Sequence, residues 1–424
     1  MKIWIKNGRL IDPKNGIDAQ LDVFIAAGKI VAVGPAPAGF QANRTLDASG
    51  LIVCPGLVDL SARLREPGFE HKATLESEMD AAVAGGVTSL VCPPDTDPPL
   101  DEPGLVEMLK HRAKSLNLAR VYPLGALTQK LEGERLTEMA ELQDAGCIAF
   151  SQADAPLVDT LALLRALQYA ATFDFSVWLR PQDTFLAKDG VAHDGEVASR
   201  LGLPAIPVCA ETIALAKIID LARVAGAKVH LCRLSSRAGM LLVKQAKAEG
   251  LPLTCDVSAH HVHLSEMDIG YFDTNCHMVP PLRSQRDREA LCEGLRDGTI
   301  DAICSDHAPV DDDAKIRPFG ESEAGATGLE LLLPLTLKWA DRSGVPLVQA
   351  LARITSCPAA VLGVDAGHLT PGQRADLCLF DPNRYWRVER DSLRSQGKNT
   401  PFLGLELAGK VRYTLVDGHV VYEG

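Results

Sequence analysis

The spacing of hydrophobic positions changes twice along the chain. In residues 1 to about 50, short apolar runs are separated by turn residues, as where Ile3 and Ile5 precede Asn7-Gly8. From about residue 51, strand-length apolar runs alternate with stretches of helical period. From about residue 365 short runs return, and Asp417-Gly418 lies between the last two. The pattern predicts hairpin strands at both ends and alternating strands and helices between them.

The middle segment contains eight expected strands separated by amphipathic helices. The strands are expected at Leu51–Leu60, Ser89–Cys92, Arg120–Leu124, Cys147–Phe150, Phe175–Leu179, Lys228–Leu231, Pro252–Val257 and Ala302–Cys304. Helices are expected at Leu75–Ala84, Leu105–Leu116, Leu161–Ala171, Ala210–Val224 and Arg237–Ala248. This alternation favours an α/β fold, a (β/α)8 TIM barrel. A doubly wound sheet is the alternative, but no Gly-x-Gly-x-x-Gly follows the first strand.

The two β-rich ends are each too small to be stable alone, so we expect them to share one core. We therefore predict a small β-sandwich domain built from both termini, residues 1–52 and 362–424. The barrel is predicted to span residues 53–361.

The composition of the chain limits which partners and which cellular compartment we expect. The chain has 424 residues with 43 Lys and Arg against 55 Asp and Glu, a net charge of −12. This acidity argues against nucleic acid or an anionic membrane as the main partner. No apolar run is long enough for a transmembrane span, and the charged first six residues do not resemble a signal peptide. The 11 cysteines form no C-x-x-C pair, which favours reduced thiols and a cytoplasmic protein.

Five short motifs follow expected barrel strands or lie in the closing β segment. They are Gly56-Leu-Val-Asp59 with Leu64–Gly68, Cys92–Pro99, Pro280–Arg283, Ser305–Pro309, and Pro371-Gly372 with Ala375–Leu377. In this order they resemble the dihydroorotase family of the amidohydrolase superfamily, nearly end to end. The resemblance implies a barrel of amidohydrolase type. It also implies hydrolysis or formation of a cyclic amide by a hydroxide bound to zinc.

The residues at the family's zinc-ligand positions are different here. The family uses a His-x-His pair on the first strand, Lys or Asp after the fourth, His on the fifth and sixth, and Asp on the eighth. The resemblance places at these positions Ser61, Arg63, Gln152, Ala153, Arg180, Arg233 and a retained Asp306. Arginine is protonated and has no free lone pair, so it is not a zinc ligand. We therefore expect no metal at these positions and no cofactor.

The substrate side is partly retained. By resemblance, Arg65 corresponds to the residue that binds the substrate carboxylate, Asp95 replaces an Asn, and His307 follows Asp306. We expect Asp306 to be a vestigial catalytic residue and the other three to be vestigial substrate-binding residues. The run His260-His261-x-His263 resembles a metal cluster, but we expect a strand or loop face there, with a new metal site as the minor alternative.

Two interpretations of the three arginines remain open. Arg63, Arg180 and Arg233 would converge at the barrel mouth and pair with Asp306, Asp95 or Asp154, because buried guanidinium groups need carboxylate partners. Alternatively, they form a site for an anionic metabolite.

The complete loss of histidine ligands is similar to that of dihydroorotase-like proteins that assemble with aspartate transcarbamoylase. We therefore expect a catalytically inactive, noncatalytic structural subunit in pyrimidine biosynthesis. Its partner would be the aspartate transcarbamoylase catalytic chain, with a homo-oligomer inside a hetero-oligomer. One alternative is an active zinc dihydroorotase with a metal relocated to Asp306, His307 and the His260 cluster. The other is an anion-binding metabolite sensor.

Overall fold

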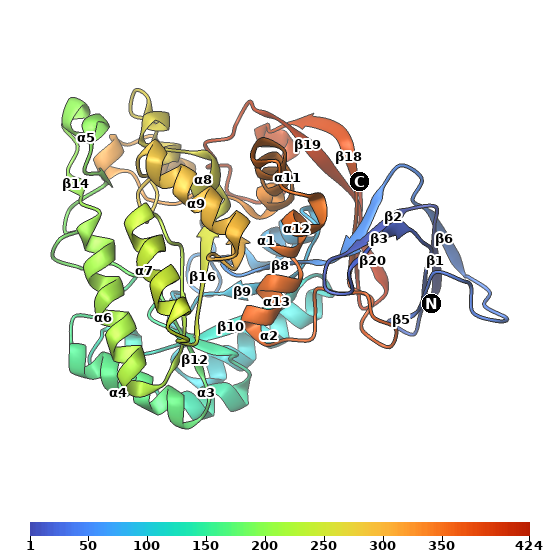
Figure 1. Ribbon diagram of the computed structural model, residues 1–424, viewed down its shortest axis with the longest axis horizontal. Coiled ribbons are helices and arrows are strands. Elements are labelled where there is room, and N and C mark those ends of the chain that lie inside the picture. Colours follow the sequence, from blue (N-terminus) through green and yellow to red (C-terminus); the bar gives the residue numbers. More distant parts are fainter.

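The computed structural model describes all residues, 1–424. An eight-stranded barrel wrapped by helices stands beside two β-sheets that contain both chain ends (Figure 1). No helix is long and apolar enough to cross a membrane.

The barrel strands are parallel and lie side by side in chain order, which confirms the predicted barrel. They are β8 (Leu57–Asp59), β9 (Val87–Cys92), β10 (Arg120–Ala126), β11 (Ala149–Ser151), β12 (Ser176–Leu179), β15 (Lys228–Leu231), β16 (Leu253–Ser258) and β17 (Ala302–Cys304). The barrel closes just beyond β8 and β17. There the His307 amide donates to the Ser61 carbonyl at 3.1 Å, and the Arg63 amide donates to the His307 carbonyl at 2.8 Å. Closure therefore places the first and last family motifs side by side.

Helices surround the strands, as Figure 1 shows. They are α1 (Leu75–Ala84), α2 (Pro103–Leu116), α3 (Met139–Ala145), α4 (Thr160–Thr172), α5 (Glu196–Leu201), α6 (Cys209–Ala225), α7 (Arg237–Ala248), α8 (Ala259–His263), α9 (Gln285–Asp297), α10 (Asp312–Lys315), α11 (Leu332–Ser343), α12 (Leu347–Ala352) and α13 (Ser356–Leu362). The five expected helices are confirmed with ends within two residues. Two short strands, β13 (Ala192–His193) and β14 (Ala205–Ile206), pair outside the barrel.

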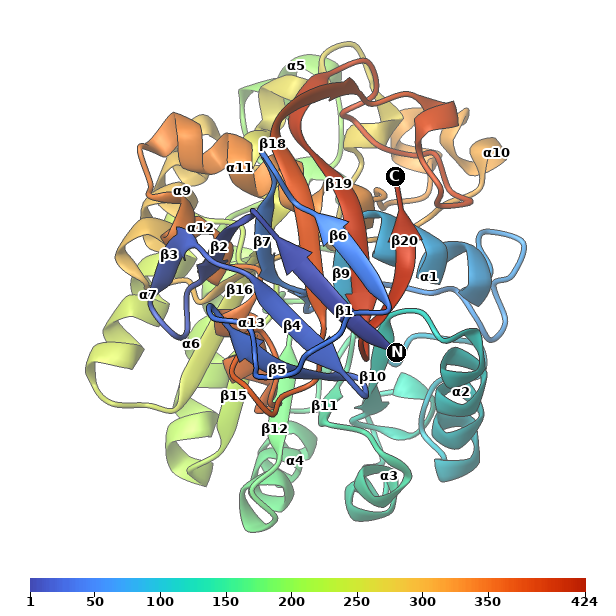
Figure 2. The ribbon, with the colours of Figure 1, turned by 90° about the vertical axis from the view of Figure 1, so that its right-hand side faces the viewer.

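Both chain ends contribute to the sheets beside the barrel, which Figure 2 shows in front of it. One sheet has the order β20-β19-β18-β7-β2-β3 and the other β5-β4-β1-β6. The strands are β1 (Lys2–Lys6), β2 (Arg9–Asp12), β3 (Ile17–Gln20), β4 (Val23–Ala26), β5 (Lys29–Val33), β6 (Arg44–Asp47), β7 (Ile52–Pro55), β18 (Leu377–Arg387), β19 (Glu406–Val416) and β20 (His419–Glu423). Ile3, Ile5, Leu377 and Leu415 are buried in one cluster, so the two ends share a core. The domain boundaries after residues 52 and 361 stay predictions.

The single strand expected over Leu51–Leu60 is wrong, because it divides at Gly56 into β7 and β8. The first half belongs to the terminal sheet and the second to the barrel. A Cβ on Gly56 would lie 2.1 Å from the Thr88 Oγ1 atom. Only glycine lets the backbone pass this close to β9 between the two sheets.

Candidate functional site

Six charged side chains meet where the barrel strands end. Each follows the carboxyl end of a different strand: Arg63 after β8, Asp95 after β9, Asp154 after β11, Arg180 after β12, Arg233 after β15 and Asp306 after β17. Carboxyl ends of parallel strands open on one face of a barrel, where active sites of this fold are built. We call these six residues the arginine–carboxylate cluster.

Asp154 is the common partner of the three arginines. Its Oδ2 atom accepts a hydrogen bond from Arg63 Nη2 at 2.6 Å. Its Oδ1 atom accepts from Arg180 Nε and Arg233 Nη2. This carboxylate, which follows β11, is therefore connected to the ends of three other barrel strands through charge-assisted hydrogen bonds.

Asp95 and Asp306 balance the remaining charge. Arg63 Nε donates to Asp95 Oδ2 at 2.8 Å, and Arg233 Nη1 donates to Asp306 Oδ1 at 3.1 Å. Arg63 Nη1 also lies 3.7 Å from that Asp306 oxygen. The predicted pairing of the arginines is thus confirmed. With three cations and three anions the cluster has no net charge, which disfavours the anion-site alternative.

Burial and charge act against each other in the cluster. Burial alone would raise the pKa of Asp154, but the guanidinium groups of Arg233, Arg180 and Arg63 outweigh it and hold that pKa well below its usual range. Asp306 behaves differently. Burial dominates there and raises its pKa, although Arg233 and Arg63 oppose the shift.

The residues present do not fit the zinc centre implied by the fold family. Three of the ligand positions hold guanidinium groups engaged with carboxylates, and no group of three or more His, Cys, Asp or Glu is arranged to hold a metal ion. Gln152 is buried with both amide atoms used, by the Thr128 hydroxyl and the Leu131 carbonyl. The space left beside Ser61 is a cavity of about 20 Å³, roughly the room for one water. No zinc-dependent step can be derived for this arrangement.

The retained substrate-side residues are placed differently from one another. Arg65 lies outside the cluster, and its Nε atom donates to the Pro309 carbonyl at 2.9 Å. His307 is 1% exposed, and its Nε2 atom lies 2.6 Å from the Glu78 carboxylate. The backbone amide of Gly328 donates to its Nδ1 atom at 3.1 Å. With both ring nitrogens occupied, His307 presents no polar atom to a substrate, and its vestigial binding role stays a prediction.

The histidine run forms a buried helix, α8, so the expected strand or loop face is wrong. His261 Nδ1 lies 2.7 Å from the Ser258 hydroxyl, and His263 Nε2 lies 2.8 Å from the Leu335 carbonyl. His260 has no hydrogen-bond partner on either ring nitrogen, and its ring stacks on Phe402. The three side chains therefore face different neighbours. Together with Asp306 and His307 they do not assemble the relocated metal site.

Sequence reasoning named Asp154 as one possible partner but missed its central position. It lies one residue beyond Gln152 and Ala153, which the resemblance places at the ligand positions after the fourth strand. In the structure Ala153 has φ of 50°, a left-handed conformation. This turn positions Asp154 to contact all three arginines. Glu78 was missed entirely, since an acidic residue inside an amphipathic helix ordinarily faces solvent.

Comparisons with known proteins agree over the whole chain. The Dihydro-orotase-like family matches residues 50–239, and the Amidohydrolase family matches residues 187–422. A Dihydroorotase-like protein of Pseudomonas aeruginosa is 48% identical over 100% of both chains, and one of Pseudomonas putida is 46% identical over 100% of this chain and 99% of its own. The solved L-hydantoinase (dihydropyrimidinase) of Arthrobacter aurescens is 25% identical with a TM-score of 0.89, covering 99% of this chain and 96% of its own.

These findings contradict the expectation that the chain is not an enzyme. A relative from Geobacter sp. (strain M21), 41% identical over 100% of both chains, is named Dihydroorotase. That name and the amidohydrolase neighbours point to an enzyme. The expectation rested only on the replaced zinc ligands. The absence of those ligands does not by itself show that the protein lacks catalytic activity. These sequence identities over the full length show that the chain belongs to the dihydroorotase-like family of amidohydrolases.

Proposed function

We propose that this chain serves pyrimidine biosynthesis in the cytoplasm as a structural subunit that assembles with the catalytic chain of aspartate transcarbamoylase. The arginine–carboxylate cluster carries the proposal. It fills the family's metal positions with a charge-balanced set of ion pairs that connects the ends of six barrel strands, while the barrel itself is intact. Such a cluster favours a rigid barrel that presents a fixed surface.

The loops around the barrel mouth supply a candidate contact surface. The three most exposed large apolar side chains are Tyr271 at 91%, Ile316 at 83% and Phe185 at 73%. They follow the carboxyl ends of β16, β17 and β12, so all three lie in loops of the mouth face. Exposed apolar side chains in loops of one face support a protein–protein contact there. We propose that the partner and a second copy of this chain dock around this face.

The experiment mixes the purified chain with the aspartate transcarbamoylase catalytic chain of the same organism and measures mass by light scattering after size exclusion. We expect a species heavier than either component. The double variant Tyr271→Ser with Ile316→Ser should lose it. The matched control, Val224→Ser with Phe173→Ser, changes side chains 71% and 51% exposed at the C-terminal ends of α6 and α4, at the opposite end of the barrel from the mouth, and should keep it. Absence of any heavier species would refute the partnership.

Amidohydrolase activity is a second candidate, compatible with the first, and the relatives named Dihydroorotase favour it. Because guanidinium groups fill the metal positions, we propose that any such turnover needs no zinc cofactor. A dihydroorotate ring-closure assay with metal analysis of the same sample tests both points. Turnover after chelation supports metal-free catalysis. Turnover that requires stoichiometric zinc and disappears in Asp306→Ala contradicts it.

A further inference from the structure

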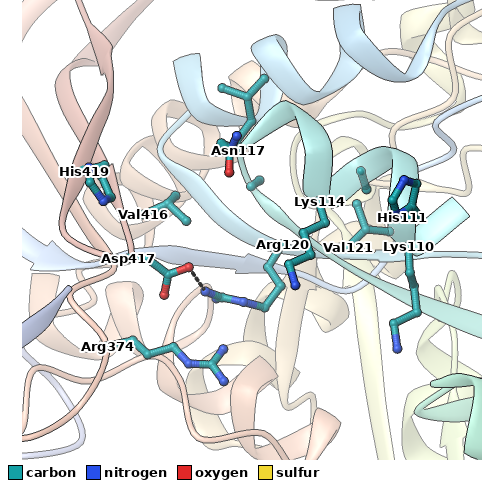
Figure 3. Close-up of a pocket in the computed structure, with 13 residues that line it drawn as sticks. Lys110, His111, Lys114, Asn117, Arg120, Val121, Arg374, Val416, Asp417 and His419 are labelled. Atoms are coloured by element: carbon teal, nitrogen blue, oxygen red, sulfur yellow. Dashed lines mark hydrogen bonds and ion pairs between the residues drawn. The ribbon is translucent and has the colours of Figure 1, made fainter. Parts of the chain in front are cut away.

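A groove of about 840 Å³ lies at the opposite end of the barrel from the arginine–carboxylate cluster. Its walls come from α2, the beginning of β10, the segment before β18 that contains Arg374, and the turn between β19 and β20 (Figure 3). Four cationic side chains line it, Lys110, Lys114, Arg120 and Arg374, against one carboxylate, Asp417. We call it the basic groove.

The cations of the basic groove are only partly neutralised. Arg120 is held by Asp376 and Asp417, each at 2.9 Å. Lys110 Nζ donates only to the Ala145 carbonyl, at 3.2 Å. Lys114 and Arg374 are exposed and have no carboxylate within 4.0 Å, although Figure 3 shows both reaching toward Arg120. In a chain of net charge −12, unpaired cations around one groove mark a local positive potential.

The floor of the groove is apolar. Ala113, Ala119, Val121 and Val416 are buried there, and the imidazoles of His111 and His419 stand at the sides. Small-molecule sites combine such apolar lining with a few polar groups, in volumes of roughly 300–1,000 Å³. Arg120 is shared by Asp417 and Asp376, which leaves one negative charge against the three other cations of the groove, so the groove stays positive overall.

We propose that the basic groove binds a small phosphorylated metabolite with two or more linked phosphates and an organic portion. Lys114 and Arg374 contact the phosphates, while Arg120 stays paired with Asp376 and Asp417. Phosphate oxygens suit lysine as a point charge and arginine as a planar donor. The organic portion covers the apolar floor. An acidic peptide fits less well, because the groove is bounded by α2 and the β19–β20 turn rather than extended along the surface. The proposal is independent of the transcarbamoylase partnership.

The experiment measures binding of three probes to the full chain by isothermal titration calorimetry at low salt: ATP, inorganic tripolyphosphate and adenosine. We expect ATP to bind at least as tightly as tripolyphosphate, and adenosine not to bind. The double variant Lys114→Ala with Arg374→Ala should weaken ATP binding at least about tenfold, since hydrogen bonds to charged groups are among the strongest in proteins. Both residues are exposed and unpaired, so folding is unaffected.

The matched control is Arg286→Ala with Arg317→Ala, which removes two exposed cations that also lack ion pairs and lie outside the groove. It changes the net charge equally and should leave ATP binding unchanged. Equal loss in both double variants would show general attraction and overturn the site. Absence of ATP and tripolyphosphate binding at millimolar concentration would overturn it too. Tighter binding of a polyglutamate peptide, or of tripolyphosphate over ATP, would overturn the ligand class.

Discussion

Replacing Asp154 with asparagine is the sharpest test of the arginine–carboxylate cluster. The substitution keeps the shape of the side chain and removes the charge that Arg63, Arg180 and Arg233 share. Arg63 retains Asp95 and Asp306, and Arg233 retains Asp306. Arg180 loses its only carboxylate partner while its side chain is 7% exposed. The cluster changes from three charges of each sign to an excess of one buried cation.

Breaking a buried ion pair by removing one partner costs about 3–5 kcal/mol. The Asp154 side chain is 31% exposed, so water can reach the arginines when the carboxylate is replaced. We therefore expect the lower end, a loss of about 3 kcal/mol in the free energy of unfolding. Asp95→Asn should lower the free energy of unfolding by less, about 1 kcal/mol, because Arg63 keeps two other carboxylate partners.

Urea unfolding followed by circular dichroism measures these differences. Adding Arg180→Met to Asp154→Asn restores the charge balance, so the double variant should lose less than the sum of the two single variants. A coupling free energy of about 1–3 kcal/mol is expected for residues in one ion-pair network. If Asp154→Asn lowers stability by no more than Asp95→Asn and the cycle shows no coupling, the cluster does not stabilise the barrel as argued.

Three further predictions concern other parts of the molecule. Glu78→Gln should destabilise by about 2 kcal/mol in urea unfolding, because the buried carboxylate accepts from His307 and Ser395, whereas the exposed Glu76→Gln should be neutral. Gly56→Ala should lower the melting temperature or solubility because its Cβ meets Thr88, whereas a Gly104→Ala control, with nothing within 4 Å, should be neutral or stabilising. Thermal melts at a series of pH values should show stability falling as pH drops from about 6.5 to 4, by about 1 kcal/mol per buried histidine at pH 5.5. The sign follows because burial lowers these pKa values in the folded state only, so the unfolded chain binds more protons. A flat profile in this window would contradict it. The histidines are His260, with a pKa of about 3, and His261, His263 and His277, with pKa values of about 4.

Most of the barrel could be predicted because its signals are local. The amphipathic period indicates α1 and α7, Thr74 and Ser236 cap their first turns, and apolar runs mark the barrel strands. The division of the first strand at Gly56 could not be predicted from periodicity. Both halves are buried, so both are apolar, and nothing in the pattern says which sheet each half joins. The helix α8 was missed for a related reason, because a five-residue segment with three histidines is too short to show a helical period.

The same difference between local signals and long-range contacts applies to the candidate sites. The residues that replace the metal ligands could be named from motifs, because each follows a strand whose position the motif fixes. Their geometry depends on a backbone turn at Ala153, which propensity does not predict for a residue other than glycine. Lys114 lies on α2 and Arg374 in the segment before β18, and only the tertiary fold brings them to one groove. The two ends of the barrel therefore differ in how their charged side chains are paired. In the arginine–carboxylate cluster every arginine has a carboxylate partner, so the charges stabilise the fold; at the basic groove Lys114 and Arg374 lack such partners, so they are available to a ligand.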